Sequence, residues 1–140
     1  MKVQQVTAGG LIFNSEGKFL IVQRALTDDF MPGYWELSSG GSKYGETPQE
    51  AVRREVKEEC GIDVVVHTPL AVDHYFIGET QRIMIVFLCT FVDKNQSIRL
   101  SEEHSASAWI PPEEIDTYHL SPFMQKLLRD ALKVGAKVLK

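Results

Sequence analysis

The sequence predicts an α/β fold in which helices cover both faces of a sheet. Residues 82–92 are apolar at consecutive positions, as in a strand that is buried on both faces. Residues 47–61 carry the start and stop signals of a helix, and residues 123–132 repeat apolar side chains at helical spacing. The chain of 140 residues is 44% hydrophobic and 24% charged, so we expect a single domain over residues 1–140.

The other elements follow from strand and turn signals along the chain. Residues 3–13 and 19–22 are apolar and flank a turn at 14–17, which predicts a hairpin. Residues 25–34 predict an exposed loop before a short strand at 35–37. Further strands are expected at 63–67, 70–76, 82–92 and 108–110, followed by a short helix from Pro111 and a final helix capped by Ser121.

The central helix has unusually complete end signals. Thr47 can cap the N-terminus, Pro48 suits the first helical position, and Glu50 completes a capping box. Gly61 is the residue best able to adopt the left-handed conformation that ends a helix. We therefore expect this helix to run to about Cys60.

Composition excludes several classes of protein. The net charge of −4 argues against broad electrostatic binding to nucleic acid. The longest apolar run, residues 83–92, is half of the about 20 residues that a helix needs to cross a bilayer, and residues 1–13 show no secretory signal, so we expect no membrane segment and a mature start near Met1. Cys60 and Cys89 form no CxxC pair, which favours a reducing, cytoplasmic location.

Three carboxylates share one face of the central helix. Glu55, Glu58 and Glu59 lie within an arc of about 100°. Glu55 faces the other two at i+3 and i+4, where like charges destabilise a helix by a few tenths of a kcal/mol, and only Arg54 has a helpful spacing, to Glu58. The helix alone leaves two alternatives, a solvated acidic face and a site for a hard cation such as Mg²⁺.

The preceding segment favours the cation. Gly40, Gly41 and Gly45 allow tight backbone turns that present carbonyls and amides to an ion or a phosphate. Glu46 adds a fourth carboxylate just before the helix, where it could also complement the helix dipole.

The spacing of these residues resembles the Nudix box, which reads Gly, five residues, Glu, seven residues, then Arg-Glu-aliphatic-x-Glu-Glu-x-Gly-aliphatic. Arg24, the segment 35–37 and the segment 109–111 are also similar to Nudix hydrolases. Every specified position of the box is matched, by Gly40, Glu46, Arg54, Glu55, Val56, Glu58, Glu59, Gly61 and Ile62.

The resemblance implies an α/β/α sandwich around a mixed sheet and a hydrolase that cleaves a nucleoside diphosphate linked to another group with Mg²⁺ or Mn²⁺. It implies that Glu59 binds the metal directly, that Glu55 and Glu58 bind it directly or through water, and that the Gly40 carbonyl completes the site. Arg54 and Glu46 would mainly orient these groups.

The family often places a further Glu before the strand that carries the late Trp. Glu103 is therefore the candidate additional ligand or general base, with Glu102 as its competitor. Where the family often has Pro-Gly-Gly, this chain has Ser38-Ser39-Gly40, so loop shape or metal geometry is expected to differ. The four histidines have no zinc-like spacing and are left out of the metal assignment.

We expect Mg²⁺-dependent hydrolysis of a nucleoside triphosphate or another nucleoside diphosphate derivative, a small-molecule substrate. Arg24 and Arg82 are candidates for phosphate contacts or for structural ion pairs. The aromatic candidates for stacking on a base, or for packing instead, are Phe30, Tyr34, Tyr75 and Phe76.

The alternatives to hydrolysis are a non-catalytic nucleotide sensor and an isoprenoid diphosphate isomerase. The intact box carboxylates speak against the sensor, and the absence of a His-rich motif speaks against the isomerase. A homodimer is expected from family habit alone.

Overall fold

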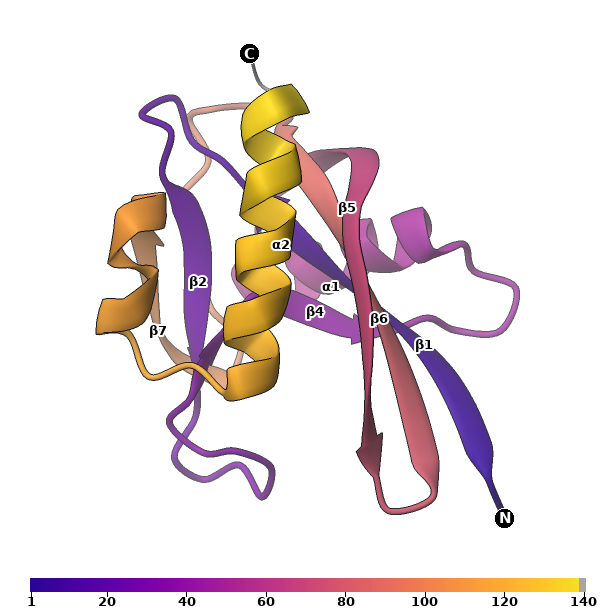
Figure 1. The fold of residues 1–140 in the computed structure, drawn as a ribbon. Coiled ribbons are helices and arrows are strands. Elements are labelled where there is room, and N and C mark those ends of the chain that lie inside the picture. Colours follow the sequence, from indigo (N-terminus) through magenta and orange to yellow (C-terminus); the bar gives the residue numbers. More distant parts are fainter. Residues whose placement is uncertain (139–140) are drawn as a thin grey trace.

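The structure, a computed structural model, describes residues 1–138, and its strands form two sheets (Figure 1). The larger sheet has the order β4-β1-β6-β5, in which β1 and β6 are parallel and the other pairs antiparallel, so the expected mixed sheet is confirmed. The smaller sheet, β3-β2-β7, is antiparallel. The elements are β1 (Val3–Ile12), β2 (Phe19–Arg24), β3 (Trp35–Glu36), β4 (Ser38–Gly41), α1 (Pro48–Cys60), β5 (Val64–Ile77), β6 (Thr80–Phe91), β7 (His104–Ile110), the 3₁₀ helix η1 (Pro112–Thr117) and α2 (Pro122–Val138).

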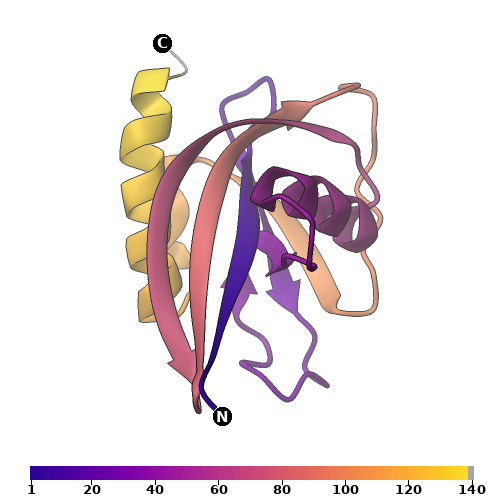
Figure 2. The same ribbon diagram turned by 90° about the vertical axis from the view of Figure 1, so that its right-hand side faces the viewer.

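The two long helices lie on opposite sides of the sheets (Figure 2). Successive side chains of a strand point to opposite faces, and β6 uses both. Val86 and Leu88 join the core cluster that contains the buried face of α2, whereas Phe87 and Cys89 join the cluster beneath α1. The expected strand with two covered faces is confirmed.

Helix α1 begins and ends where the sequence predicts. Thr47 accepts a hydrogen bond from the Glu50 amide, and the Glu50 side chain bonds back to the Thr47 backbone. Gly61 has φ 71° and donates its amide to the Lys57 carbonyl. The capping box and the left-handed end therefore fix which residues of α1 face β4.

The expected N-terminal hairpin is wrong. Both edges of β1 are already paired, one with β4 and the other with β6. Beyond the Phe13–Phe19 bridge, β2 therefore diverges into the second sheet, where it pairs with β3 and β7.

Three further elements differ from expectation. Residues 38–41 form a strand rather than a glycine turn, because they pair with residues 7–10 of β1. The two strands expected at 63–67 and 70–76 are one, β5, with irregular pairing around Pro69, which has no amide hydrogen to donate. Strand β7 starts at His104, four residues before its expected start, because it follows the whole length of β2.

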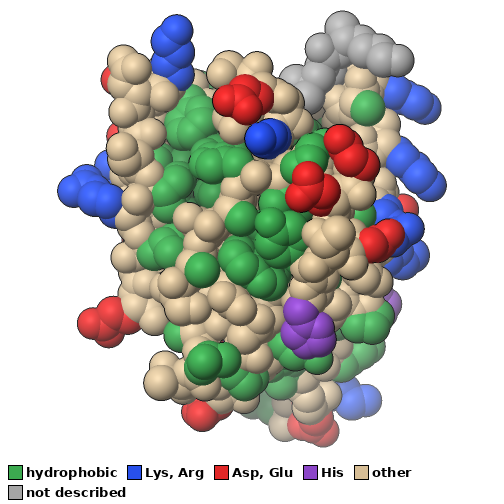
Figure 3. All heavy atoms as spheres, turned by 90° about the vertical axis from the view of Figure 1, so that its left-hand side faces the viewer, with side chains coloured by type: hydrophobic (Ala, Val, Ile, Leu, Met, Phe, Trp, Pro, Cys, Tyr) green, Lys and Arg blue, Asp and Glu red, His purple; other side chains and the backbone are tan. Residues whose placement is uncertain are grey.

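On the face shown in Figure 3, hydrophobic side chains gather in the middle and charged ones lie mostly around them.

Both cysteines are free and buried, and burial raises the thiol pKa to about 11 for Cys60 and to about 12 for Cys89. No helix within residues 1–138 is long and apolar enough to span a bilayer.

Candidate active site

The carboxylate of Glu59 is buried between α1 and β4. Only 4% of the residue is exposed. The Ser38 hydroxyl donates to Glu59 Oε1 at 2.7 Å, and the Ser39 amide donates to the same oxygen at 3.2 Å. Because Ser38 and Ser39 pair with Gly10 and Gly9 of β1, the sheet register places both donors beneath the last turn of α1.

Burial is the main cause that raises the pKa of Glu59 well above its usual range. The Ser38 hydrogen bond lowers this pKa, whereas the nearby carboxylates of Glu55 and Glu36 and a hydrogen bond to Glu103 raise it. Glu59 thus holds a proton at neutral pH more readily than an exposed Glu. A bound cation would favour the loss of that proton.

Arg54 is surrounded by the other box acids. Its Nε and Nη2 donate to the two oxygens of Glu46 at 2.8 and 3.0 Å, a two-pronged pair that holds the pKa of Glu46 at about 2. Its Nη1 donates to Glu55 at 2.8 Å and to Glu58 at 3.3 Å. The guanidinium therefore orients three of the four box carboxylates.

The Glu55 carboxylate lies directly against the backbone of Gly40. A Cβ added at Gly40 would overlap all three carboxylate atoms of Glu55. Glu55 is half-buried, and this burial raises its pKa. Gly40 is thus required for close approach between β4 and α1.

Glu103 reaches the same region from the loop before β7. Glu59, Glu103 and His104 each offer a ligand atom within 4.8 Å of the others. Among the described residues, Glu102 is not part of this group. The proximity of His104 to these carboxylates is not predicted from its spacing, because residues distant in sequence meet here through the fold.

The donor set suits a divalent cation. Carboxylate oxygens are hard ligands, and Glu59 and Glu103 offer theirs within 4.8 Å of each other, while Glu55 and Glu58 lie nearby on Arg54. Among residues 1–138, Arg54 is the one basic side chain paired with the box acids, so it cannot neutralise all of them. Glu59, Glu55, Glu58, Glu103 and the Gly40 carbonyl are the residues that would hold the ion.

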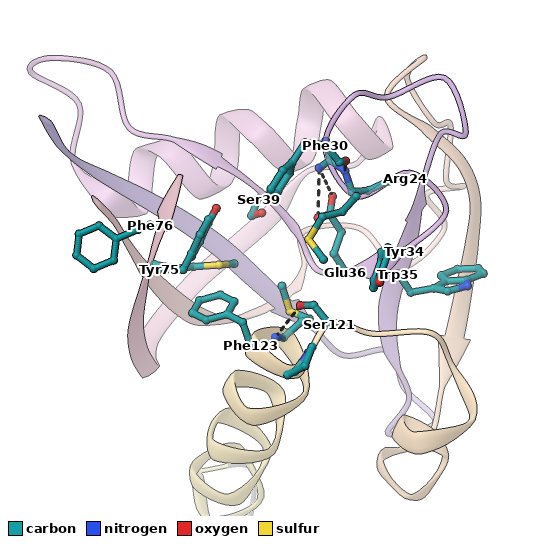
Figure 4. A pocket seen from close by; sticks show the side chains of 14 residues that line it. Arg24, Phe30, Tyr34, Trp35, Glu36, Ser39, Tyr75, Phe76, Ser121 and Phe123 are labelled. Atoms are coloured by element: carbon teal, nitrogen blue, oxygen red, sulfur yellow. Dashed lines mark hydrogen bonds and ion pairs between the residues drawn. The ribbon is translucent and has the colours of Figure 1, made fainter. Parts of the chain in front are cut away.

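An aromatic-lined cavity of about 280 Å³ adjoins this acidic region (Figure 4). Tyr75 from β5 and Phe123 from α2 face each other with ring centroids 4.7 Å apart, and Phe30 and Tyr34 line the cavity from the loop 25–34. Phe76 borders the same cavity, but its ring is directed outward and 62% of the residue is exposed, because adjacent residues of a strand point to opposite faces.

The two candidate arginines have different partners. Arg24 pairs with Asp28 at 2.6 Å and with Glu36 at 3.1 Å, and it donates to the Phe30 carbonyl. Arg82 makes one long contact, 3.5 Å to the Tyr75 hydroxyl, and its buried Nε has no hydrogen-bond partner among residues 1–138. Arg82 borders a second cavity of about 410 Å³ that is also lined by Gly40 and Gly41.

Some residues at the site were missed from the sequence. In the sequence, Ser38 stands out only as a departure from the family pattern, and Glu36 only as part of the similar segment 35–37. Their roles depend on β4 pairing with β1 and on β3 pairing with β2, which no local signal predicts. His104 gave a weak signal, as a polar residue next to Glu103.

Comparison with known proteins identifies the family of the chain. A family model described as NUDIX domain matches residues 3–131. The nucleoside triphosphatase NudI of Escherichia coli O17:K52:H18 is 32% identical over 128 residues, which cover 84% of this chain and 90% of that protein.

Solved structures agree with this. The MutT protein of Methanosarcina mazei Go1 superimposes with a TM-score of 0.85 at 28% identity, covering 94% of this chain and 95% of that one. The E. coli ORF135 protein gives a TM-score of 0.77 at 27% identity, covering 97% and 94%. The box, the fold and these relatives together show that the chain belongs to the Nudix family and is a Nudix hydrolase.

Proposed function

We propose that the protein is a Mg²⁺-dependent pyrophosphohydrolase that cleaves a nucleoside triphosphate or another nucleoside diphosphate derivative. Mn²⁺ is proposed to replace Mg²⁺ in this reaction. The observation that carries the proposal is the approach of Glu59 and Glu103 to within 4.8 Å, with Glu55 and Glu58 held nearby by Arg54, close to an aromatic cavity lined by Glu36 and Ser39. The NudI relative, whose name describes a nucleoside triphosphatase, supports a triphosphate as the first substrate to test.

The roles of the chain's own groups follow from their positions. Glu59, fixed by Ser38 and Ser39, and Glu55, against Gly40, hold the ion, while Arg54 and Glu46 keep these carboxylates in place. When bound there, a divalent cation would neutralise charge on phosphate oxygens and would lower the pKa of water.

Glu103 is the proposed general base, with Glu58 as the second candidate because its side chain is 55% exposed and therefore accessible to water. The carboxylate takes the proton as the water oxygen bonds to phosphorus, and the bridging P–O bond breaks to release the phosphate or pyrophosphate.

The base and phosphates are assigned to the two cavities. Tyr34 and Tyr75 are proposed to contact the base, with Phe76 at the rim, and Arg82 is the better phosphate candidate because its guanidinium has few protein partners. Arg24 is already engaged with Asp28 and Glu36.

The free, buried cysteines support a cytoplasmic location. A homodimer stays a prediction that sedimentation would test.

The test is a panel of nucleoside triphosphates, nucleotide sugars and dinucleotides, incubated with Mg²⁺ or Mn²⁺, with every released product identified. We expect hydrolysis of at least one class, and a loss of turnover of about a hundredfold or more in Glu58→Gln and Glu59→Gln with the fold retained. Nucleotide binding without any product would favour a sensor, and unchanged rates in both variants would exclude the proposed site.

A further inference from the structure

The imidazole of His104 is buried behind the acidic region. Its side chain is 1% exposed, and its Nε2 lies 2.9 Å from Glu36 Oε2. Since Glu36 is paired with Arg24, its carboxylate accepts hydrogen bonds, so His104 Nε2 carries the hydrogen and donates. The Nδ1 atom has no hydrogen-bond partner among residues 1–138. Within these residues the ring therefore makes its hydrogen bond to Glu36.

Glu36 also forms an ion pair with Arg24. The Arg24 Nη1 lies 3.1 and 3.3 Å from the two Glu36 oxygens. Both side chains are mostly buried, at 20% and 17% exposed, so the pair is shielded from water. Hydrogen bonds that involve charged groups in such surroundings are stronger than exposed ones.

Arg24 in turn fixes the loop 25–34. Its Nη2 binds Asp28, its Nε donates to the Phe30 carbonyl at 2.7 Å, and its guanidinium lies 5.3 Å from the centre of the Phe30 ring. Its backbone closes the loop, because its amide donates to the Tyr34 carbonyl and its carbonyl accepts from Gly33. Phe30 and Tyr34 are therefore placed by Arg24.

Other contacts hold the two ends of this loop, since the Ala25 amide donates to the Glu103 carbonyl and the Tyr34 ring lies 4.0 Å from that of His119. Around Phe30 the polar contacts come from Arg24 and from Asp28, which Arg24 itself pairs with.

Met31 has φ 48°, a left-handed conformation that non-glycine residues adopt only when their surroundings enforce it. Met31, Phe30 and Tyr34 all line the aromatic cavity. A continuous series of contacts therefore links His104, through Glu36 and Arg24, to the part of the cavity wall around Phe30.

We propose that His104 is a positioning residue that acts through Glu36 and Arg24 to hold the loop 25–34 as one wall of the cavity. A buried charged chain is a weak source of stability compared with apolar packing, which favours a role in positioning over one in holding the core together. The kinetic consequence of this inference rests on the proposed function, because it treats the cavity as the substrate pocket.

The experiment compares two substitutions of His104. In His104→Gln the side-chain amide can occupy the place of Nε2 and donate to Glu36, whereas the shorter amide of His104→Asn cannot reach it. His67→Asn is the matched control, because His67 is exposed and bonds Thr90 away from both cavities. Hydrogen exchange of the Phe30, Gly33 and Tyr34 amides reports on the loop, and exchange in α1 reports on the fold.

We expect exchange in the loop to be about tenfold faster in His104→Asn, with wild-type rates in His104→Gln and in α1 of both variants. For a hydrolysed nucleotide, we expect His104→Asn to raise KM about tenfold with kcat changed less than about threefold. Unchanged loop exchange in His104→Asn, equal loss in both variants, or a fall in kcat at constant KM would overturn the inference. If the wild type hydrolyses no nucleotide, the proposed function fails while the exchange measurement still decides this inference.

Discussion

At the scale of single residues, Ser38 is one of the two serines that replace Pro and Gly of the Pro-Gly-Gly pattern common in the family. Its hydroxyl is buried and bonds the carboxylate on which metal binding would depend. We predict that Ser38→Ala weakens Mn²⁺ affinity about tenfold, because a lost hydrogen bond to a charged group costs about 1.5–3 kcal/mol and the pKa of Glu59 rises further. Titration of Mn²⁺ by electron paramagnetic resonance measures this affinity.

Ser39→Ala is the matched control for this measurement. The Ser39 contact to Glu59 comes from its backbone amide, which the substitution keeps. We expect Ser39→Ala to bind Mn²⁺ as the wild type does. Equal affinities in all three proteins would show that the Ser38 hydroxyl does not hold Glu59 for the ion.

At the scale of elements, the site is the contact between β4 and α1. A methyl group at Gly40 would overlap the Glu55 carboxylate, whereas one at Gly41 would meet the Gln5 amide nitrogen at 2.6 Å, the end of a flexible side chain that can move. We predict that Gly40→Ala lowers kcat/KM about a hundredfold and Gly41→Ala less than about tenfold, measured on the hydrolysed nucleotide with both folds checked by circular dichroism. The reverse order of activity would contradict this account of the contact.

The same elements show what the sequence can and cannot predict. The sequence predicts a helix from Pro48 to about Cys60, and α1 has these ends, because Thr47, Glu50 and Gly61 act within one turn of them. The acidic face followed from helical periodicity and from the resemblance to the box. Strand β4 and the place of β2 were not predicted, because they depend on which edge of β1 is free, a property of the assembled sheet. Glu36 and His104 were missed for the same reason, since β3 and β7 place them from either side of β2.

At the scale of the whole molecule, the acidic cluster sets how the stability of the metal-free protein depends on pH. Burial raises the pKa of Glu59 and Glu55 above the ordinary value of 4.5, while Arg54 lowers that of Glu46 to about 2. Above pH 4.5 the folded protein binds more protons at Glu59 and Glu55 than the unfolded chain does, so stability falls as pH rises. The contribution of Glu46 is present above pH 4.5 and is lost as pH falls toward 2.

We therefore predict that the melting temperature of the metal-free protein, measured in EDTA, is highest near pH 5 and declines toward pH 9 as Glu59 ionises. The groups that face the Glu59 carboxylate are Ser38, Glu55, Glu103 and Glu36. In Glu59→Gln the uncharged amide can keep the Ser38 bond, so at pH 8 this variant should be more stable than the wild type by about 1 kcal/mol or more, a shift of several degrees.

Added Mg²⁺ should raise the melting temperature of the wild type more at pH 8 than at pH 5, because ion and proton compete for the same oxygens. It should raise the melting temperature of Glu59→Gln little. Parallel declines in both proteins would mean that Glu59 does not carry the pH dependence, and a Mg²⁺ effect of equal size in both would place the ion elsewhere.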